Sequence, residues 1–182
     1  MRKDLGSKTW CMPLPVGIIG TYDENGVANA MNAAWVGIYD FGKIYISLSE
    51  HKTTDNFVKT GAFTLSFATK DTEVASDYFG IVSGKDVNKI EKAGFHPVKS
   101  DKVDAPLFEE YPLTLECTVD SFDEGNLVGS IVNVSVDENY ISEDGSVNVD
   151  KMGLILFDSI NSSYRLLGNE IGKAFKDGFK LK

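Results

Sequence analysis

Runs in which apolar and polar residues alternate cover much of this sequence, and they constrain the fold more than any other feature. From Lys43 to Ser49 every second residue is isoleucine or leucine, and residues 63–67 alternate in the same way. A period of two is typical of a half-buried strand, because successive side chains point to opposite faces of a sheet. The same reasoning predicts strands in the second half of the chain, at residues 113–119, 128–136, 154–157 and 164–167.

A hairpin is predicted near the start of the chain. Two apolar segments, residues 16–21 and 27–38, flank the sequence Asp23-Glu24-Asn25-Gly26. Asn-Gly between strand-like runs is a strong hairpin signal. Six or seven antiparallel strands are therefore expected. The repeating strand–helix–strand pattern of a parallel sheet is missing, so the sequence favours a mainly β fold, a closed β-barrel with one helical insertion.

Other segments have the longer period of a helix or the composition of a loop. Residues 53–59 predict a short helix whose first turn can be capped by hydroxyls and which Gly61 follows. Residues 71–95 predict the helical insertion, in two parts that form a small lobe, and residues 100–112 predict a connecting loop with two prolines. One domain is expected over residues 1–182, because 42% hydrophobic and 25% charged residues suit a single core.

Charge and cysteine content exclude several classes of protein. A formal net charge of -9 would repel a polyphosphate backbone, so no nucleic-acid partner is expected. No window approaches the run of about 20 apolar residues that spans a membrane, and residues 1–6 lack the apolar stretch of a signal peptide, so we expect no membrane partner and a cytoplasmic location. Cys11 and Cys117 form no CxxC pair and are expected to be free thiols, with Cys117 buried.

Several chemical motifs are missing. There is no GxGxxG, and no Gly-Lys pair is followed by Ser or Thr, so neither a Rossmann fingerprint nor a Walker loop is present. The only histidines are His51 and His96, which excludes a clustered imidazole metal site, and no metal is predicted. The absence of GxSxG disfavours a hydrolase with a serine nucleophile.

One segment has the composition of a phosphate site. A predicted strand runs into His51-Lys52 and then into the start of a short helix. Helix N-H groups, a lysine and hydroxyls together attract an anion, because donors and positive charge converge on one point. The alternative is that Thr53 or Thr54 only caps the helix and that Lys52 is solvated. The candidate phosphate-binding residues are Ser47, Ser49, His51, Lys52, Thr53, Thr54 and Asn56.

A second unusual segment is Asn29-Ala30-Met31-Asn32-Ala33-Ala34-Trp35, where small residues and amides occupy a predicted strand that would ordinarily prefer branched or aromatic side chains. Small side chains would let a flat ligand lie against the backbone, and Asn32 offers both a donor and an acceptor. The alternative is a crowded barrel interior that needs small residues, with Trp35 in the core.

Two further segments could close over a pocket. The first is Ser83-Gly84-Lys85-Asp86, and the second is the C-terminal stretch 168–175, which contains Lys173 and Phe175. Their ordinary interpretations are a helix cap at Asp86 and a frayed tail.

The sequence resembles the flavin reductase-like proteins with an FMN-binding split barrel, and within them the flavoredoxin branch. The resemblance spans nearly the whole chain, and six segments fall in the family's order. These segments are Pro13-Leu14-Pro15-Val16 with the hairpin, residues 29–35, residues 47–56, residues 80–89 with Ala105-Pro106-Leu107, residues 113–117, and Leu167-Gly168-Asn169-Glu170-Ile171-Gly172.

The resemblance implies an antiparallel, Greek-key-type split barrel that binds FMN non-covalently near the interface of a homodimer. It implies a phosphate held by residues 49–54 and a flavin ring against residues 32–35. The cofactor performs the redox step in such proteins, so no catalytic residue is assigned. The full set of expected cofactor-binding residues is Met31, Asn32, Ala33, Ala34, Trp35, Ser47, Ser49, His51, Lys52, Thr53, Thr54, Asn56, Ser83, Lys85, Lys173 and Phe175.

The sequence departs from the family pattern at two places. Lys52 stands where the family often has an arginine, and residues 123–131 contain no histidine where many flavin reductases carry one. The expected function is an FMN-dependent oxidoreductase that transfers electrons between NAD(P)H or a redox protein and flavin or another acceptor. The alternatives are a non-enzymatic split barrel that carries flavin or haem, and a structural dimerisation domain whose alanines serve packing alone.

Overall fold

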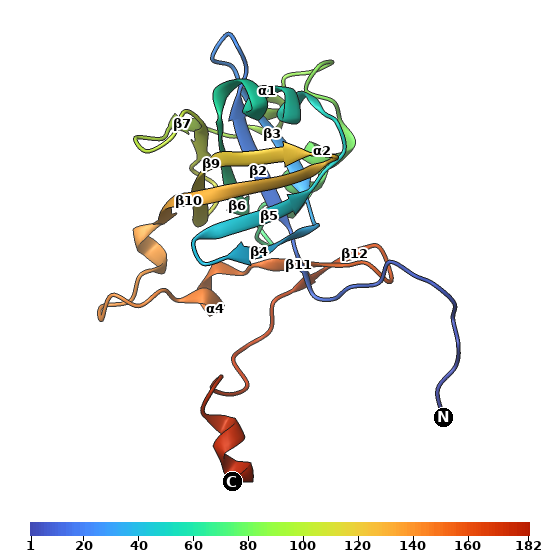
Figure 1. Ribbon diagram of the computed structural model, residues 1–182. Coiled ribbons are helices and arrows are strands. Elements are labelled where there is room, and N and C mark those ends of the chain that lie inside the picture. The colour runs from blue at the N-terminus through green and yellow to red at the C-terminus, as the bar shows by residue number, and fades with distance from the viewer.

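Seven antiparallel strands form one strongly curled sheet in the centre of the molecule (Figure 1). The computed structural model describes residues 1–182. The strand order is β3-β2-β6-β9-β10-β5-β4, and the two edge strands β3 and β4 do not pair with each other. The expected mainly β, antiparallel fold is confirmed, as a half-barrel that is split and not closed. Its strands are β2 (Gly17–Tyr22), β3 (Ala28–Ala33), β4 (Val36–Asp40), β5 (Lys43–Ser47), β6 (Ala62–Phe67), β9 (Leu113–Asp123) and β10 (Asn126–Val136).

The remaining elements are helices and short strands around this sheet. The helices are α1 (Lys52–Thr60), α2 (Glu73–Ile81), α3 (Lys89–Ala93), α4 (Val149–Met152) and the 3-10 helices η1 (Glu138–Tyr140) and η2 (Asp177–Leu181). The short strands are β1 (Leu14–Pro15), β7 (Pro97–Lys99), β8 (Pro106–Phe108), β11 (Ile155–Asp158) and β12 (Ser163–Leu166). No helix is long and apolar enough to cross a membrane.

The predicted N-terminal hairpin is confirmed as β2 and β3. Its turn is closed by Asp23, whose Oδ1 accepts the backbone N-H groups of Asn25 and Val27, each at 3.0 Å. Gly26 has a φ of 73°, which a residue without Cβ adopts at no steric cost. The expected single strand over residues 27–38 is wrong, because the chain leaves β3 after Ala33 and starts β4 at Val36, on the opposite edge of the sheet.

The long hairpin of β9 and β10 curls the sheet. Its register shifts twice, once after Val128 and once after Ile131, and such bulges bend a strand and increase its twist. Gly129 lies beside the first shift, where a Cβ would stand 2.7 Å from the ring of Phe63 and 2.9 Å from the Thr118 carbonyl. The strand can therefore pass over the barrel core only because residue 129 has no side chain.

The prediction that the helices of residues 71–95 form a small lobe is wrong, because these helices pack directly on the barrel. α2 and α3 lie against β3. Phe79 of α2 and Ile90 of α3 belong to the same buried cluster as Ile18 and Ala30 of the sheet. A second cluster fills the barrel interior, where Cys117 is fully buried as predicted, and this burial raises the pKa of its thiol to about 12.

The segment 100–112, expected to be only a loop, contains β8, which pairs with β7 in a small ribbon. Proline is tolerated there because a two-stranded ribbon leaves the outer edge of each strand unpaired. The ribbon is tied to the barrel by the hydroxyl of Thr64, which donates to the Pro106 carbonyl at 2.6 Å.

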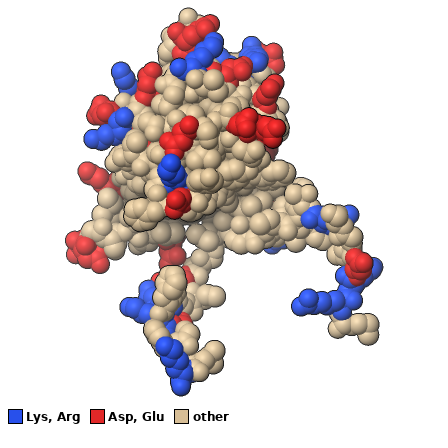
Figure 2. Space-filling view, in the orientation of Figure 1, with Lys and Arg blue, Asp and Glu red and all other residues tan.

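Two arms extend from the body of the molecule (Figure 1). Residues 1–13 precede the three-stranded sheet β1-β11-β12, and residues 167–182 follow it. Ile171 and Phe175 of the C-terminal arm are almost fully exposed. Figure 2 shows that the surface along the root of the N-terminal arm is mostly uncharged.

Candidate functional site

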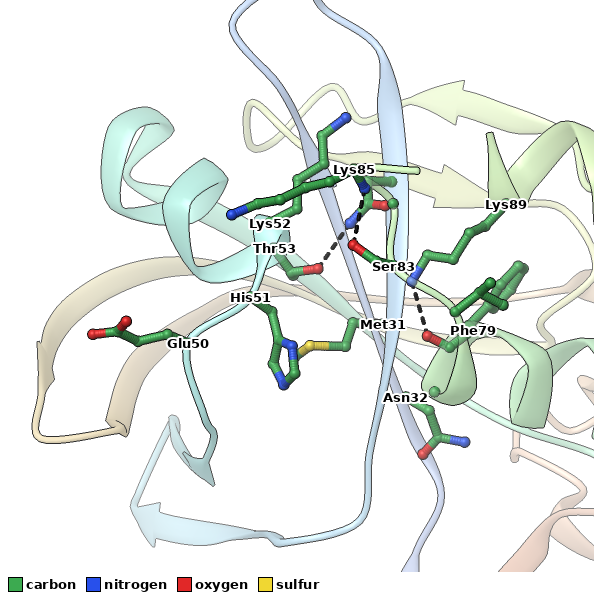
Figure 3. Close-up of a pocket in the computed structure, with 14 residues that line it drawn as sticks. Met31, Asn32, Glu50, His51, Lys52, Thr53, Phe79, Ser83, Lys85 and Lys89 are labelled. Atoms are coloured by element: carbon green, nitrogen blue, oxygen red, sulfur yellow. Dashed lines mark hydrogen bonds between the residues drawn. The ribbon is translucent and has the colours of Figure 1, made fainter. Parts of the chain in front are cut away.

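A cavity of about 220 Å³ lies between β3, the start of α1 and the loop that joins α2 to α3 (Figure 3). We call it the lysine cavity. Strand β3 contributes Asn29, Met31 and Asn32, and the approach to α1 contributes residues 50–53. The third wall comes from the end of α2, the following loop and the start of α3, namely residues 79–80, residues 82–85 and Lys89.

The start of α1 presents backbone donors to this cavity. Thr54 caps the helix, because its hydroxyl accepts the His51 N-H at 2.9 Å and donates to the His51 carbonyl at 2.7 Å. The N-H groups of Lys52 and Thr53 donate to no protein acceptor. Free N-H groups at a helix start, with the positive end of the helix dipole, form a binding site for an anion.

Gly84 brings the loop after α2 close to β3. A Cβ on Gly84 would overlap the side-chain amide of Asn29, so no other residue fits without a shift of the loop. Asn29 is buried and donates to the hydroxyl of Thr53 at 2.8 Å. The buried amide of Asn29 therefore connects β3 to the first turn of α1, and it also limits how closely the loop after α2 can approach β3.

Three lysines line this cavity in a chain of net charge -9. Lys52 pairs with Asp23 at 3.1 Å, and Lys85 pairs with Asp55 at 3.2 Å. Lys89 is only 4% exposed and pairs with no carboxylate; its Nζ donates to the Phe79 carbonyl at 2.8 Å, inside the cavity (Figure 3). Burial, and to a smaller extent Lys52, lowers the pKa of Lys89 to about 8.

A second cavity, of about 250 Å³, adjoins the first and shares Asn32 and Gly80 with it. We call it the tyrosine cavity. Its other lining residues are Ala34, Asp77, Ile81, Phe157 and Tyr164. Gly80 lies against Asn32, because a Cβ on Gly80 would be 3.1 Å from that of Asn32. The two cavities thus follow one another along β3 and α2, and together they reach the size of a cofactor pocket.

Seven of the predicted cofactor-binding residues line the lysine cavity, and one lines the tyrosine cavity alone. The seven are Met31, Asn32, His51, Lys52, Thr53, Ser83 and Lys85, and the one is Ala34. Both the strand of small residues and the loop after α2 therefore meet the predicted phosphate segment. Lys52 forms an ion pair with Asp23, and its side chain is 25% exposed.

The other predicted residues lie outside both cavities. Ala33 packs in the barrel core, which agrees with the packing alternative for that position, while Trp35 is 54% exposed. Ser47 and Ser49 come before the lining residues 50–53 in the sequence and do not line the cavity. The hydroxyl of Thr54 is engaged in the helix cap. Asn56 donates to Thr21 on another face of α1. Lys173 and Phe175 belong to the C-terminal arm, where Lys173 pairs with Glu170.

Among the lining residues that the sequence did not predict, four carry polar or charged side chains that matter for the site: Asn29, Lys89, Asp77 and Tyr164. Asn29 and Lys89 stood inside segments that the sequence analysis singled out, but nothing in the local pattern indicates that Lys89 is buried. Asp77 and Tyr164 are 87 positions apart, and the Tyr164 hydroxyl donates to Asp77 at 2.7 Å. No local signal could have paired them.

The residues present fit a flavin mononucleotide. The lysine cavity offers free N-H groups and a buried cation for a phosphate, and Gly84 leaves room that a Cβ would fill. The tyrosine cavity combines apolar walls, from Ala34 and Phe157, with the amide of Asn32, as a flat heterocycle requires.

Comparison with known proteins agrees with this geometry. Residues 9–156 match the model of the flavin reductase like domain. The flavoredoxin of Desulfovibrio vulgaris (Miyazaki F) is 33% identical, with a TM-score of 0.94 over 98% of this chain and 100% of that chain. The flavoredoxin of Methanosarcina acetivorans is 26% identical, with a TM-score of 0.87 over 100% of both chains. An FMN-binding protein of Thermus thermophilus, 20% identical with a TM-score of 0.75 over 95% of this chain and 99% of that chain, shares the fold.

The domain match covers most of the chain, and the resemblance predicted from the six ordered segments is confirmed. The chain belongs to the flavin reductase-like family, in its flavoredoxin branch, and is a flavin-related oxidoreductase.

Proposed function

We propose that the protein binds FMN non-covalently along β3 and transfers electrons between NAD(P)H or a redox protein and flavin or another acceptor. The main observation in its support is the lysine cavity, which three lysines and the free N-H groups at the start of α1 line in an acidic chain. The phosphate would lie at this end, and the flavin ring would extend toward the tyrosine cavity, since the two cavities share Asn32 and Gly80.

Each part of the site has a task in this proposal. The N-H groups of Lys52 and Thr53 donate to phosphate oxygens, and Lys52 and Lys89 neutralise the phosphate charge. Ala34 leaves space for the ring, and Asn32, whose Nδ2 donates to the Ser76 carbonyl at 2.9 Å, is held in a fixed orientation. Bound FMN supplies the electron-transfer chemistry, and the protein supplies position and electrostatics.

The absorbance spectrum of the purified protein tests cofactor binding, and flavin absorbance is the expected result. Lys52→Ala should weaken FMN binding by about tenfold to a hundredfold, because a hydrogen bond to a charged group contributes about 1.5–3 kcal/mol. Lys59→Ala is the matched control, since Lys59 lies on the same helix and pairs with Glu24 at the surface. A colourless protein that takes up no added FMN would refute the proposal.

The electron donor is tested separately. Anaerobic mixing of the FMN-loaded protein with NADH or NADPH bleaches the flavin absorbance if the nicotinamide is the donor. If neither nucleotide bleaches it while dithionite does, the electrons come from a redox protein and the chain is an electron carrier. A flavin that no donor of either class reduces would favour the non-enzymatic binding module.

We also propose that the protein is a homodimer. The exposed apolar side chains of the C-terminal arm, among them Ile171, Phe175 and Leu181, have no cover within the chain. Ile38 and Phe41 near the end of edge strand β4 are similarly exposed. The arm extends away from the body of the molecule (Figure 1), and Lys173 and Phe175 line neither cavity of their own chain. In the proposed dimer these two residues would reach the FMN site of the second copy.

A further inference from the structure

The two adjoining cavities differ in charge. The lysine cavity has three lysines and one carboxylate, that of Glu50, on its wall, and its Lys89 is paired with no carboxylate. The tyrosine cavity has no lysine or arginine and one carboxylate, that of Asp77. No basic side chain forms an ion pair with Asp77, and Glu73, one turn earlier on α2, adds negative charge near Tyr164. The lysine cavity therefore suits an anion, and the tyrosine cavity disfavours one.

Asp77 is held in position by the opposite wall of the tyrosine cavity. Its Oδ1 accepts the Tyr164 hydroxyl at 2.7 Å. Tyr164 is opposite Phe157 in the register of β11 and β12, and their ring centroids are 6.2 Å apart. β11 also pairs with β1, so three strands support the phenol that donates to Asp77. Burial, together with Asp77, raises the pKa of the Tyr164 hydroxyl, which keeps it a donor at neutral pH.

We infer that Asp77, held by Tyr164, lowers the reduction potential of the bound flavin. This inference rests on the proposed function, in which the ring lies toward the tyrosine cavity. Uptake of two electrons and one proton from the donor gives the flavin ring one negative charge. A fixed carboxylate beside the ring repels that charge, and no cation of the cavity offsets it. The reduced protein is then a stronger reductant than free reduced FMN.

The test measures the midpoint potential of FMN bound to the full-length protein. Asp77→Asn keeps the shape and an acceptor for Tyr164 but removes the charge. Reduced FMN should then bind about tenfold more tightly relative to oxidised FMN, a positive shift of about 30 mV for a two-electron couple. Asp77→Glu keeps the charge and should retain the lower potential. Tyr164→Phe leaves the carboxylate without its donor and should shift the potential in the negative direction.

Asp71→Asn is the matched control, because Asp71 is exposed, lies two residues before α2 and pairs with Lys70. It changes the net charge by the same amount and should leave the potential unchanged. An unchanged potential in FMN-loaded Asp77→Asn, or an equal shift in Asp71→Asn, would overturn the inference while the proposed function stands. If the unaltered protein takes up no FMN, the absorbance spectrum shows that the proposed function itself has failed.

Discussion

At the scale of single residues, Lys89 is the most informative side chain of the site. It is buried without a carboxylate partner, and burial of an unpaired cation is unfavourable unless a ligand compensates it. The carbonyl of Phe79 offers its Nζ one hydrogen bond. A phosphate would supply the missing negative charge.

The pH dependence of FMN binding tests this role of Lys89. The pKa of Lys89 is lowered to about 8, so the side chain loses its proton as pH rises through that value. Phosphate attracts the protonated form, so FMN affinity should fall above pH 8, measured by fluorescence titration. In Lys89→Met this fall should disappear. Riboflavin, which has no phosphate, is the control ligand, and an equal fall for riboflavin would contradict the assignment.

At the scale of elements, the start of α1 combines a helix cap with unpaired backbone donors. The hydroxyl of Thr54 serves the backbone of His51, which leaves the N-H groups of Lys52 and Thr53 unpaired. The capping role predicted for Thr54 is therefore confirmed, and the phosphate-binding role of the segment stays a prediction. Thr54 caps the helix, and its neighbours face the cavity.

Removal of the cap tests how the two features depend on each other. Thr54→Val should lower the free energy of unfolding by about 1 kcal/mol, the usual cost of a lost helix cap, as measured by urea denaturation. FMN affinity should fall as well, because the first turn of α1 frays. Val58→Ala, an exposed change on the same helix, should stay within about 0.5 kcal/mol. Unchanged stability in Thr54→Val would show that the cap contributes nothing.

At the scale of the whole molecule, the two arms carry exposed apolar side chains that no other part of the same chain covers. The C-terminal arm ends in η2 and carries exposed Phe179 and Leu181. Exposed apolar side chains in such number mark an interaction surface. A second copy of the chain is the partner that we propose.

Truncation after Leu167 tests the assembly. The full chain should sediment as a dimer, and the truncated chain should shift toward monomer with weaker FMN binding, because Lys173 and Phe175 are lost. Sedimentation equilibrium and flavin fluorescence measure the two effects. The double variant Lys180→Ala and Lys182→Ala, which changes charge but keeps every apolar residue of the arm, is the control. A full chain that sediments as a monomer would contradict the homodimer.

The sequence by itself determined the local features of this protein. The period of two predicted the strands, Asn25-Gly26 predicted the hairpin, and residues 53–59 predicted α1 to within one residue at each end. These features depend on neighbouring residues, whose backbone preferences and side-chain directions repeat over short distances. The order of the six family segments identified the family, from which we expect an FMN site.

Only the tertiary structure decided which distant groups meet. The break between Ala33 and Val36 follows from the separation of β3 and β4 at opposite edges, which no local period specifies. The burial of Lys89 and the bond from Tyr164 to Asp77 arise because α2, α3 and β12 converge beside β3. Such contacts join residues far apart in the chain, and their energy depends on the packing of the whole fold.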